Sequence, residues 1–408
     1  MNRMPDIDSI DIPGLFEWVA GQQDRLVDDL VRLAQLETPS DDVGLLEVGL
    51  KYLDDWITER IGKSSKRSLY QSVEYGSTVV LDYSGVGPNR IVCIGHYDTV
   101  FDRGTLTSWP VQVDGDRISG PGVFDMKGGL VQLVWALRAL IELGIDPPPF
   151  RLVLNGDEEI GSPFSRPLLE DACLGAAAVL VFEGSADGAV KTARKGVGLF
   201  TVTAEGVESH AGLDPDAGAS AIEEIAQVIT DLHNGADSQS GTSINVGIVD
   251  GGTRANVVAA RATAQIDIRV ATSAEQARVD RLLAALSPRH SRVRLQVTGG
   301  WNRPIMTRSD EVAQMYALAC GVADRLGFQL AEASVGGASD GNFVAALGIP
   351  LLDGLGAVGR GAHARHENVS IDGMVQRTAL AAGIIATFAL PSNGVRTDVP
   401  VTARRPND

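Results

Sequence analysis

The chain has few cysteines and lacks any long apolar run. Its three cysteines, Cys93, Cys173 and Cys320, are odd in number and widely spaced, so we expect neither a disulfide framework nor a thiolate metal site. No run of about 18 apolar residues is available to span a bilayer, and the N-terminal residues show no basic segment followed by an apolar one. These absences predict a protein of the reducing cytoplasm with no membrane partner.

Positive charge is also scarce. The 408 residues carry 35 Lys and Arg against 52 Asp and Glu, for a formal net charge of −17. An acidic chain is poorly suited to nucleic acid, so we expect no nucleic-acid partner. The apolar fraction of 44% is that of an ordinary globular protein, and the length favours two domains.

The order of the expected helices and strands changes along the chain and divides it into parts. Residues 1–193 and 304–390 alternate helical patterns, the first two at 14–36 and 43–60, with short strand-like runs. Residues 194–303 instead follow the order strand, helix, strand, strand, helix, strand, with the third strand expected at 257–270. We therefore predict an α/β fold in which a discontinuous domain from both ends of the chain carries an inserted, ferredoxin-like β-α-β-β-α-β unit. Residues 391–408 are expected to form a frayed tail.

The residues that could carry chemistry stand where strand-like runs end. An apolar run ends at Gly95, directly before a His-x-Asp sequence, and two further apolar runs end in glutamates. The carboxyl ends of strands are where α/β proteins build their sites. The set comprises His96, Asp98, Asp125, Glu158, Glu159, Glu183 and, late in the chain, His363.

This set predicts a site for two divalent metal ions. Mixed imidazole and carboxylate ligands suit zinc, cobalt or manganese better than calcium or magnesium, which prefer oxygen alone. Two ions about 3.5 to 4 Å apart need a bridging carboxylate, and Asp125 in its Gly-rich turn is the candidate. Adjacent Glu158 and Glu159 point to different sides, so one can bind metal while the other stays free as a general base. A lone His-x-Asp or a run of acids would ordinarily be a solvated turn. Because acidic or histidine residues follow several strand-like runs, we favour a functional site over that interpretation.

Several motifs together resemble a known family. They are His96-x-Asp98, the run from Gly120 through Asp125 and Met126 to Gly129, Asp157-Glu158-Glu159, Glu183, Glu208-Ser209-His210-Ala211-Gly212, and His363-x-x-x-Glu367. In order and spacing, from about residue 25 to 390, the chain resembles the aminoacylase and glutamate carboxypeptidase family of dinuclear zinc peptidases. Within that family it is most similar to the carboxypeptidase G type of glutamate carboxypeptidase.

The resemblance implies a role for each residue of the set. By resemblance, one metal is held by His96 and Glu183 and the other by Glu159 and His363, while Asp125 bridges, Asp98 steadies His96 and Glu158 is the base. It also implies a cis peptide bond between Asp125 and Met126. In the implied mechanism, Glu158 takes a proton from a water that attacks the carbonyl and then hands it to the leaving amine.

Residues 194–303 are similar to the lid and dimerisation domain of the family, which implies a homodimer. By resemblance, His210 polarises the scissile carbonyl, and Asn256 and Arg269 grip the free carboxylate of the substrate. Lys191 and Arg303 match further basic positions of the glutamate-specific subgroup. His210 either reaches the partner subunit's metals across a two-fold axis or approaches those of its own subunit by hinge closure.

We therefore expect a metal-dependent carboxypeptidase that releases a C-terminal amino acid, with glutamate favoured, from a small peptide or N-acyl amino acid. An N-acyl-amino-acid deacylase or a dipeptidase would use the same metal site. A catalytically inactive relative that serves as a binding or scaffold protein is a third possibility. That possibility predicts a lost metal ligand or a lost base, and the sequence has lost neither.

Overall fold

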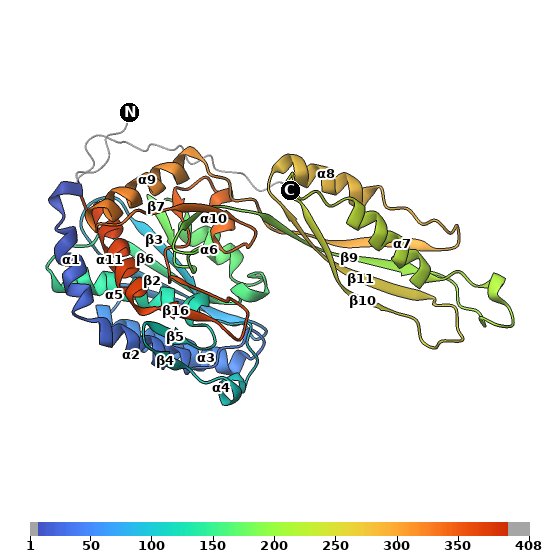
Figure 1. The fold of residues 1–408 in the computed structure, drawn as a ribbon, viewed down its shortest axis with the longest axis horizontal. Coiled ribbons are helices and arrows are strands. Elements are labelled where there is room, and N and C mark those ends of the chain that lie inside the picture. Colours follow the sequence, from blue (N-terminus) through green and yellow to red (C-terminus); the bar gives the residue numbers. More distant parts are fainter. Residues whose placement is uncertain (1–6, 391–408) are drawn as a thin grey trace.

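Short apolar runs form the strands of a mixed six-stranded sheet in the computed structural model, which describes residues 7–390 (Figure 1). The strand order is β1-β2-β6-β3-β7-β14. Strands β6, β3, β7 and β14 are parallel, and β1 and β2 run antiparallel at one edge. Their bounds are β1 (Lys66–Tyr70), β2 (Gly76–Tyr83), β3 (Ile91–His96), β6 (Phe150–Gly156), β7 (Ala178–Val181) and β14 (Leu351–Leu352). The carboxyl ends of β6, β3 and β7 therefore meet at one edge of the sheet.

Helices cover both faces of this sheet. Along β3, Ile91 and Cys93 enter one apolar core while Val92 and Ile94 enter another on the opposite face, as the two-residue repeat of a strand requires. The larger core is formed with α1 (Ile12–Ala20), α2 (Gln23–Ala34), α3 (Val43–Ile61), α5 (Gly128–Glu142), α11 (Ile371–Thr387) and most of α9 (Asp310–Arg325). The smaller core is formed with α6 (Arg166–Cys173) and α10 (Gly341–Ala346). We call this part of the molecule the large lobe.

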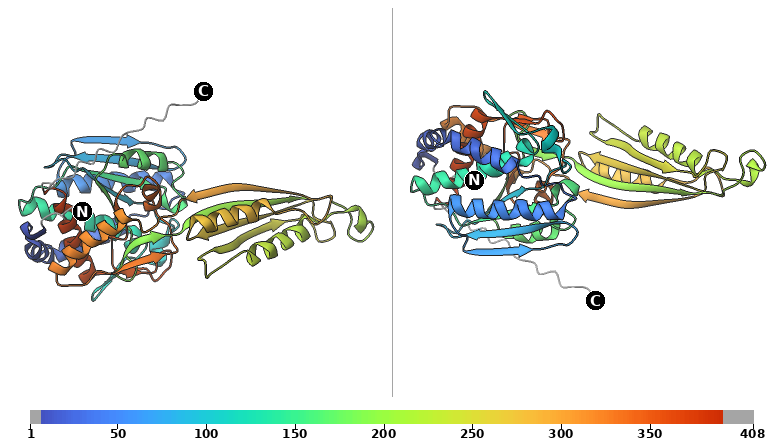
Figure 2. Two further views of the ribbon diagram at one scale, coloured as in Figure 1. Left: turned by 90° about the horizontal axis from the view of Figure 1, so that it is seen from above. Right: turned by 90° about the horizontal axis from the view of Figure 1, so that it is seen from below.

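The segment between the two halves of the large lobe forms a second sheet with its own core. Its elements are β9 (Gly196–Glu205), α7 (Ala221–Asn234), β10 (Ser243–Gly251), β11 (Arg261–Val270), α8 (Ser273–Ala284) and β12 (Arg294–Arg303). The strand order is β10-β11-β9-β12, and every neighbouring pair is antiparallel. Figures 1 and 2 show this inserted lobe extending away from the large lobe, to which β9 and β12 connect it.

Shorter elements complete the large lobe. They are η1 (Ile7–Ser9), α4 (Thr105–Ser108), β4 (Gln112–Asp114), β5 (Arg117–Ser119), η2 (Val123–Lys127), η3 (Glu158–Ile160), β8 (Val190–Arg194), β13 (Glu332–Val335), β15 (Gly359–Arg360) and β16 (Asn368–Ser370), while η4 (Pro215–Ala217) lies in the inserted lobe. A small sheet in the order β15-β16-β5-β4 joins chain near residue 118 to chain near residue 369. This sheet brings the turn that carries Asp125 beside the loop that carries His363.

The structure differs from the sequence-based expectation in several elements. The helix expected at 14–36 is two helices, because α1 ends at Ala20, and the N–H of the next residue, Gly21, bonds back to the carbonyl of Glu17. The strand expected at 257–270 begins at Arg261. Strand β1 was not expected, because an exposed edge strand has no apolar alternation to reveal it. The expected tail at 391–408 lies outside the described residues. Among the helices described, none is both long and apolar enough to cross a membrane.

Candidate metal centre and active site

The predicted residues meet at the carboxyl edge of the large sheet. His96 is the last residue of β3, and Glu158 and Glu159 lie in η3 directly after β6. Glu183 follows β7. Because β6, β3 and β7 are neighbours, these side chains converge although they are far apart in the sequence.

Asp125 lies between two imidazoles. Its Oδ1 is 3.3 Å from Nε2 of His96, and its Oδ2 is 3.4 Å from Nε2 of His363. Glu183 Oε1 lies 3.6 Å from the same nitrogen of His96, and Glu159 Oε2 lies 2.9 Å from that of His363. One carboxylate is therefore shared by two histidine and glutamate pairs, which is the arrangement that the resemblance implied.

The turn that presents Asp125 is held by a buried carboxylate. Glu367 accepts hydrogen bonds from the N–H groups of Gly122 (3.2 Å), Phe124 (2.7 Å) and Asp125 (2.9 Å). The peptide bond between Asp125 and Met126 is cis, which confirms that prediction. The sequence contained Glu367 in the His363-x-x-x-Glu367 motif, but only the folded chain shows what its carboxylate binds.

Asp98 contacts both His96 and the acidic turn. Nδ1 of His96 lies 3.0 Å from the backbone carbonyl of Asp98 and 3.3 Å from its Oδ1. The carboxylate also accepts hydrogen bonds from the N–H groups of Glu158 and Glu159, both at 3.2 Å, and from Ser40 Oγ at 2.8 Å. Asp98 thus lies where it can steady the imidazole, as predicted, and it anchors the turn with the two glutamates as well.

The cluster is rich in negative charge. Burial lowers the pKa of His96, but hydrogen bonds to Asp125, Asp98 and Glu183 outweigh burial and raise it well above the usual value. Hydrogen bonds to Asp125 and Glu159 raise the pKa of His363 to about 11. Burial raises the pKa of Glu159 to about 7 and that of Glu158 well above the usual range. These shifts are those of a site that gains from a bound cation.

The donor set fits divalent metal ions. Ligand atoms of His96, Asp125 and Glu159 lie within 4.8 Å of one another, and so do those of His96, Glu158 and Glu183. Oε1 of Glu159 is buried and has no hydrogen-bond partner within residues 7–390, although buried polar atoms are normally paired. An unpaired carboxylate oxygen beside imidazoles is suited to the metals that prefer mixed nitrogen and oxygen ligands.

Three of the predicted substrate-binding residues lie in or beside the large lobe. Lys191, in β8, is half-buried, and desolvation lowers its pKa. Arg269 forms a salt bridge with Asp267 at 3.0 Å and donates to the carbonyl of Gly336 in the large lobe at 3.0 Å. Arg303 is 4% exposed and bonds to Glu158. Their contacts to a substrate remain predictions.

His210 and Asn256 lie elsewhere. They belong to the loops after β9 and β10, at the end of the inserted lobe that is remote from the large lobe (Figures 1 and 2). The two loops contact each other, because the N–H of Ala211 donates to the carbonyl of Asn256 at 3.0 Å. Nδ1 of His210 accepts from the N–H groups of Gly212 and Leu213, both at 3.1 Å. Within one chain, therefore, these two residues do not reach the metal cluster.

The profile of Peptidase family M20/M25/M40 matches residues 92–387 of this chain. The chain belongs to this family. Carboxypeptidase G2 from Pseudomonas sp. (strain RS-16) is 28% identical over 383 residues, which cover 91% of each chain. Acetylornithine deacetylase from Myxococcus xanthus is 27% identical over 327 residues, covering 75% of this chain and 82% of the relative. The family and these relatives identify the chain as a peptidase or amidohydrolase rather than an inactive scaffold.

Solved structures of M20 peptidases share the fold. Aminopeptidase PepT from Bacillus cereus superposes with a TM-score of 0.72 at 20% identity, over 90% of this chain and 99% of that chain. The YXEP protein of Bacillus subtilis, described as a dinuclear metal binding peptidase from the M20 family, superposes with a TM-score of 0.63 at 16% identity, over 91% and 99%. These likenesses confirm the α/β architecture.

We expect divalent metal to stabilise the folded chain through Asp125. A metal that binds only the folded state adds about 2.7 kcal/mol at 100 times its dissociation constant. In thermal unfolding of the chelated protein, Zn²⁺ should raise the midpoint for wild type. Asp125→Asn should lose most of the increase, because the amide keeps only one of the two bridging oxygens and carries no negative charge.

Asp55→Asn is the matched control, since Asp55 is exposed and, within residues 7–390, its carboxylate pairs only with Lys51. Equilibrium dialysis should give two ions per chain for wild type and for this control. An Asp125→Asn variant that binds two ions with wild-type affinity would contradict the bridging assignment.

Proposed function

We propose that the chain is a metal-dependent carboxypeptidase that releases a C-terminal amino acid, with glutamate favoured, from small peptides or N-acyl amino acids. The observation that carries this proposal is the Asp125 carboxylate, which lies between His96 and His363. A separate carboxylate, that of Glu158, lies close to His96. The similarity to carboxypeptidase G2 over 91% of the chain supports the carboxypeptidase reaction, and the preference for glutamate rests on the resemblance of the sequence motifs.

The geometry supports the assignment of the metal ligands. We assign His96 and Glu183 to one ion, Glu159 and His363 to the other, and Asp125 to both, with Zn²⁺ as the expected metal and Co²⁺ or Mn²⁺ as alternatives. When bound, the ions lower the pKa of water and polarise the carbonyl that is attacked.

Glu158 is the proposed general base. It takes a proton from the attacking water and passes it to the leaving amine. Asp98 accepts a hydrogen bond from the backbone N–H of Glu158 and contacts the ring of His96, so that the backbone of the acidic turn and the imidazole keep their places as charge moves.

The inserted lobe is proposed as a ferredoxin-like lid and dimerisation domain spanning residues 194–303, between catalytic segments 1–193 and 304–390. Its edge strand β10 has unpaired backbone groups on one side, which a second copy can pair with. Because His210 and Asn256 lie at the remote end of this lobe, we propose that a homodimer presents them to the partner's metals. His210 would then meet the developing oxyanion, and Asn256, Arg269 and Lys191 would bind the substrate carboxylates.

An N-acyl-amino-acid deacylase or dipeptidase is the second candidate. The similarity to acetylornithine deacetylase favours it, because the same metal ligands and the same base would serve the hydrolysis of an amide whichever side of the bond carries the recognised group. We propose the cytoplasm as the compartment for either activity, since all three cysteines are free.

A hydrolysis screen separates the two candidates. With Zn²⁺, Co²⁺ or Mn²⁺ loaded, we expect N-acyl glutamates to be cleaved with higher kcat/KM than other N-acyl amino acids, and C-terminal amides to be resistant. Glu158→Gln should retain two bound ions while kcat falls by about 10² to 10⁴-fold, which is the usual contribution of a positioned general base to the rate. Equal cleavage of amides and free acids would refute carboxypeptidase action, and loss of metal from the variant would show that Glu158 is a ligand.

Mixed dimers test whether His210 acts across the interface. A Glu158→Gln subunit has a good His210, and a His210→Ala subunit has a good base. If His210 acts in trans, co-refolded mixtures should regain activity, because each heterodimer then contains one intact site. Mixtures that stay as inactive as their parents, although native mass spectrometry shows heterodimers, would favour hinge closure within one subunit.

A further inference from the structure

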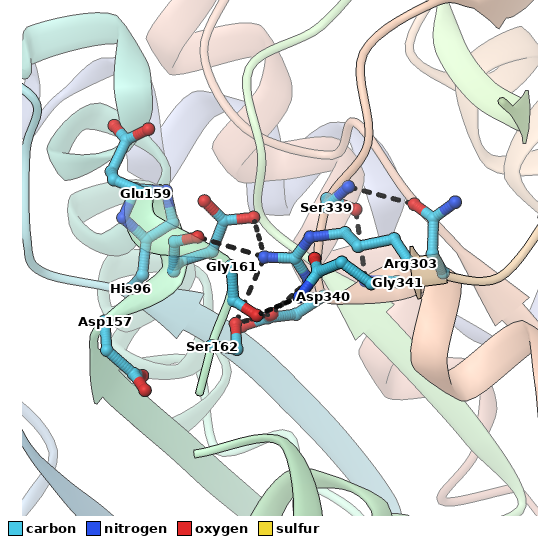
Figure 3. A network of polar contacts seen from close by, with 12 residues as sticks. His96, Asp157, Glu159, Gly161, Ser162, Arg303, Ser339, Asp340 and Gly341 are labelled. Atoms are coloured by element: carbon cyan, nitrogen blue, oxygen red, sulfur yellow. Dashed lines mark hydrogen bonds and ion pairs between the residues drawn. The ribbon is translucent and has the colours of Figure 1, made fainter. Parts of the chain in front are cut away.

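The guanidinium of Arg303 is engaged within the chain. Its Nη2 donates to Oε1 of Glu158 at 2.8 Å and lies 3.0 Å from the backbone carbonyl of the same residue. Its Nη1 donates to Oδ1 of Asp340 at 2.7 Å. The guanidinium therefore lies between two carboxylates, and Figure 3 shows Arg303 in the polar network that includes Ser162 and Asp340. Neither terminal nitrogen is left without a partner in the chain.

The far side of Arg303 is anchored by a buried network. Asp340 is 2% exposed and also accepts hydrogen bonds from Ser162 Oγ and from Asn155 Nδ2. Ser162 Oγ accepts a hydrogen bond from Nη2 of Arg303 at 3.1 Å (Figure 3). The ring of Phe343 lies against the guanidinium, with its centroid 4.6 Å from Cζ. Moving Arg303 onto a substrate would break these contacts and leave Asp340 buried without its cation, which is costly.

Glu158 depends on this arginine. In the described part of the chain, Arg303 is the one side chain that hydrogen-bonds to the Glu158 carboxylate. Ligand atoms of Glu158 also lie within 4.8 Å of those of His96 and Glu183. A carboxylate that close to two predicted metal ligands, and held by nothing else, is free to turn and become a ligand itself.

We propose that Arg303 is a positioning residue that holds Glu158 in the place of a general base and away from the metal ligands, rather than a contact to the substrate carboxylate. The inference rests on the proposed function, in which Glu158 is the base. A general base works only within hydrogen-bond reach of its proton, so a fixed carboxylate raises kcat. Arg303 ends β12, the strand that returns from the inserted lobe to the large lobe, so the placement of the base depends on that connection.

The kinetic test separates positioning from substrate binding. Arg303→Ala should lower kcat by about 10 to 100-fold and leave KM within about 3-fold, because the lost interaction acts on the base and not on the bound substrate. Arg303→Lys should restore part of kcat, since an ammonium supplies the charge without the two-ended fork. A rise in KM with kcat unchanged would overturn the proposal and show a substrate contact.

Arg60→Ala is the matched control. Arg60 also forms a two-nitrogen salt bridge, with Asp29, but on helices α2 and α3 away from the metal cluster. It should lower the unfolding midpoint without changing kcat. If Arg303→Ala fails to fold, Ser162→Ala removes a hydroxyl that contacts both Arg303 and Asp340, and it should lower kcat less while leaving KM unchanged. A Ser162→Ala variant with wild-type kinetics would then count against the proposal.

Crystal structures of metal-loaded wild type and Arg303→Ala provide a readout that needs no activity. We expect the Glu158 carboxylate on Arg303 in wild type and turned toward His96 and Glu183 in the variant, with residues 159–162 unmoved. A Glu158 that keeps its position without Arg303 would overturn the inference. If wild type cleaves no N-acyl amino acid or peptide, the proposed function fails, whereas these structures still decide whether Arg303 positions Glu158. If Arg303→Ala does not crystallise, the position of Glu158 can be compared between wild type and Ser162→Ala instead.

Discussion

The arrangement of the site depends on one shared carboxylate. Asp125 directs one oxygen to His96 and the other to His363, and these histidines come from opposite halves of the large lobe. Carboxylates gathered this closely repel one another unless positive charge lies between them. The raised pKa values of both imidazoles show this need for positive charge within the chain. The same need for positive charge explains why these side chains suit a metal ion better than they suit an ordinary buried salt bridge.

Much of the surrounding structure keeps these carboxylates in place. Glu367 accepts three N–H groups of the Asp125 turn, so the loop that carries His363 also supports the turn that carries Asp125. Asp98 holds the N–H groups of Glu158 and Glu159. Each contact joins segments that are distant in the sequence, which gives geometric precision to a site formed largely of loop residues.

The two lobes divide the chemistry of the site. The predicted metal ligands and the base belong to the large lobe, whereas His210 and Asn256 lie at the remote end of the inserted lobe. A single chain therefore brings the predicted metal ligands together without the residues expected to complete the site. This separation is the physical reason for proposing a dimer.

The sequence by itself predicted the order of elements in the inserted lobe from its periodic patterns, and it predicted a cluster of histidines and carboxylates at the ends of apolar strands. The assignment of each metal ligand and of the base, and the cis bond after Asp125 that the structure contains, were implied by the resemblance of its motifs to a family. The ends of apolar strands can be read from periodicity, and a Gly-rich turn can be read from its residues. Sequence could not show that Arg303 bonds to Glu158 and Asp340, or that Glu367 holds the Asp125 turn, since these partners are between 37 and 245 residues apart. Nor could it show where His210 lies. Such contacts are decided only when strands β3, β6 and β7 align and β12 returns to the large lobe, because hydrogen bonds between distant side chains leave no periodic trace along the chain.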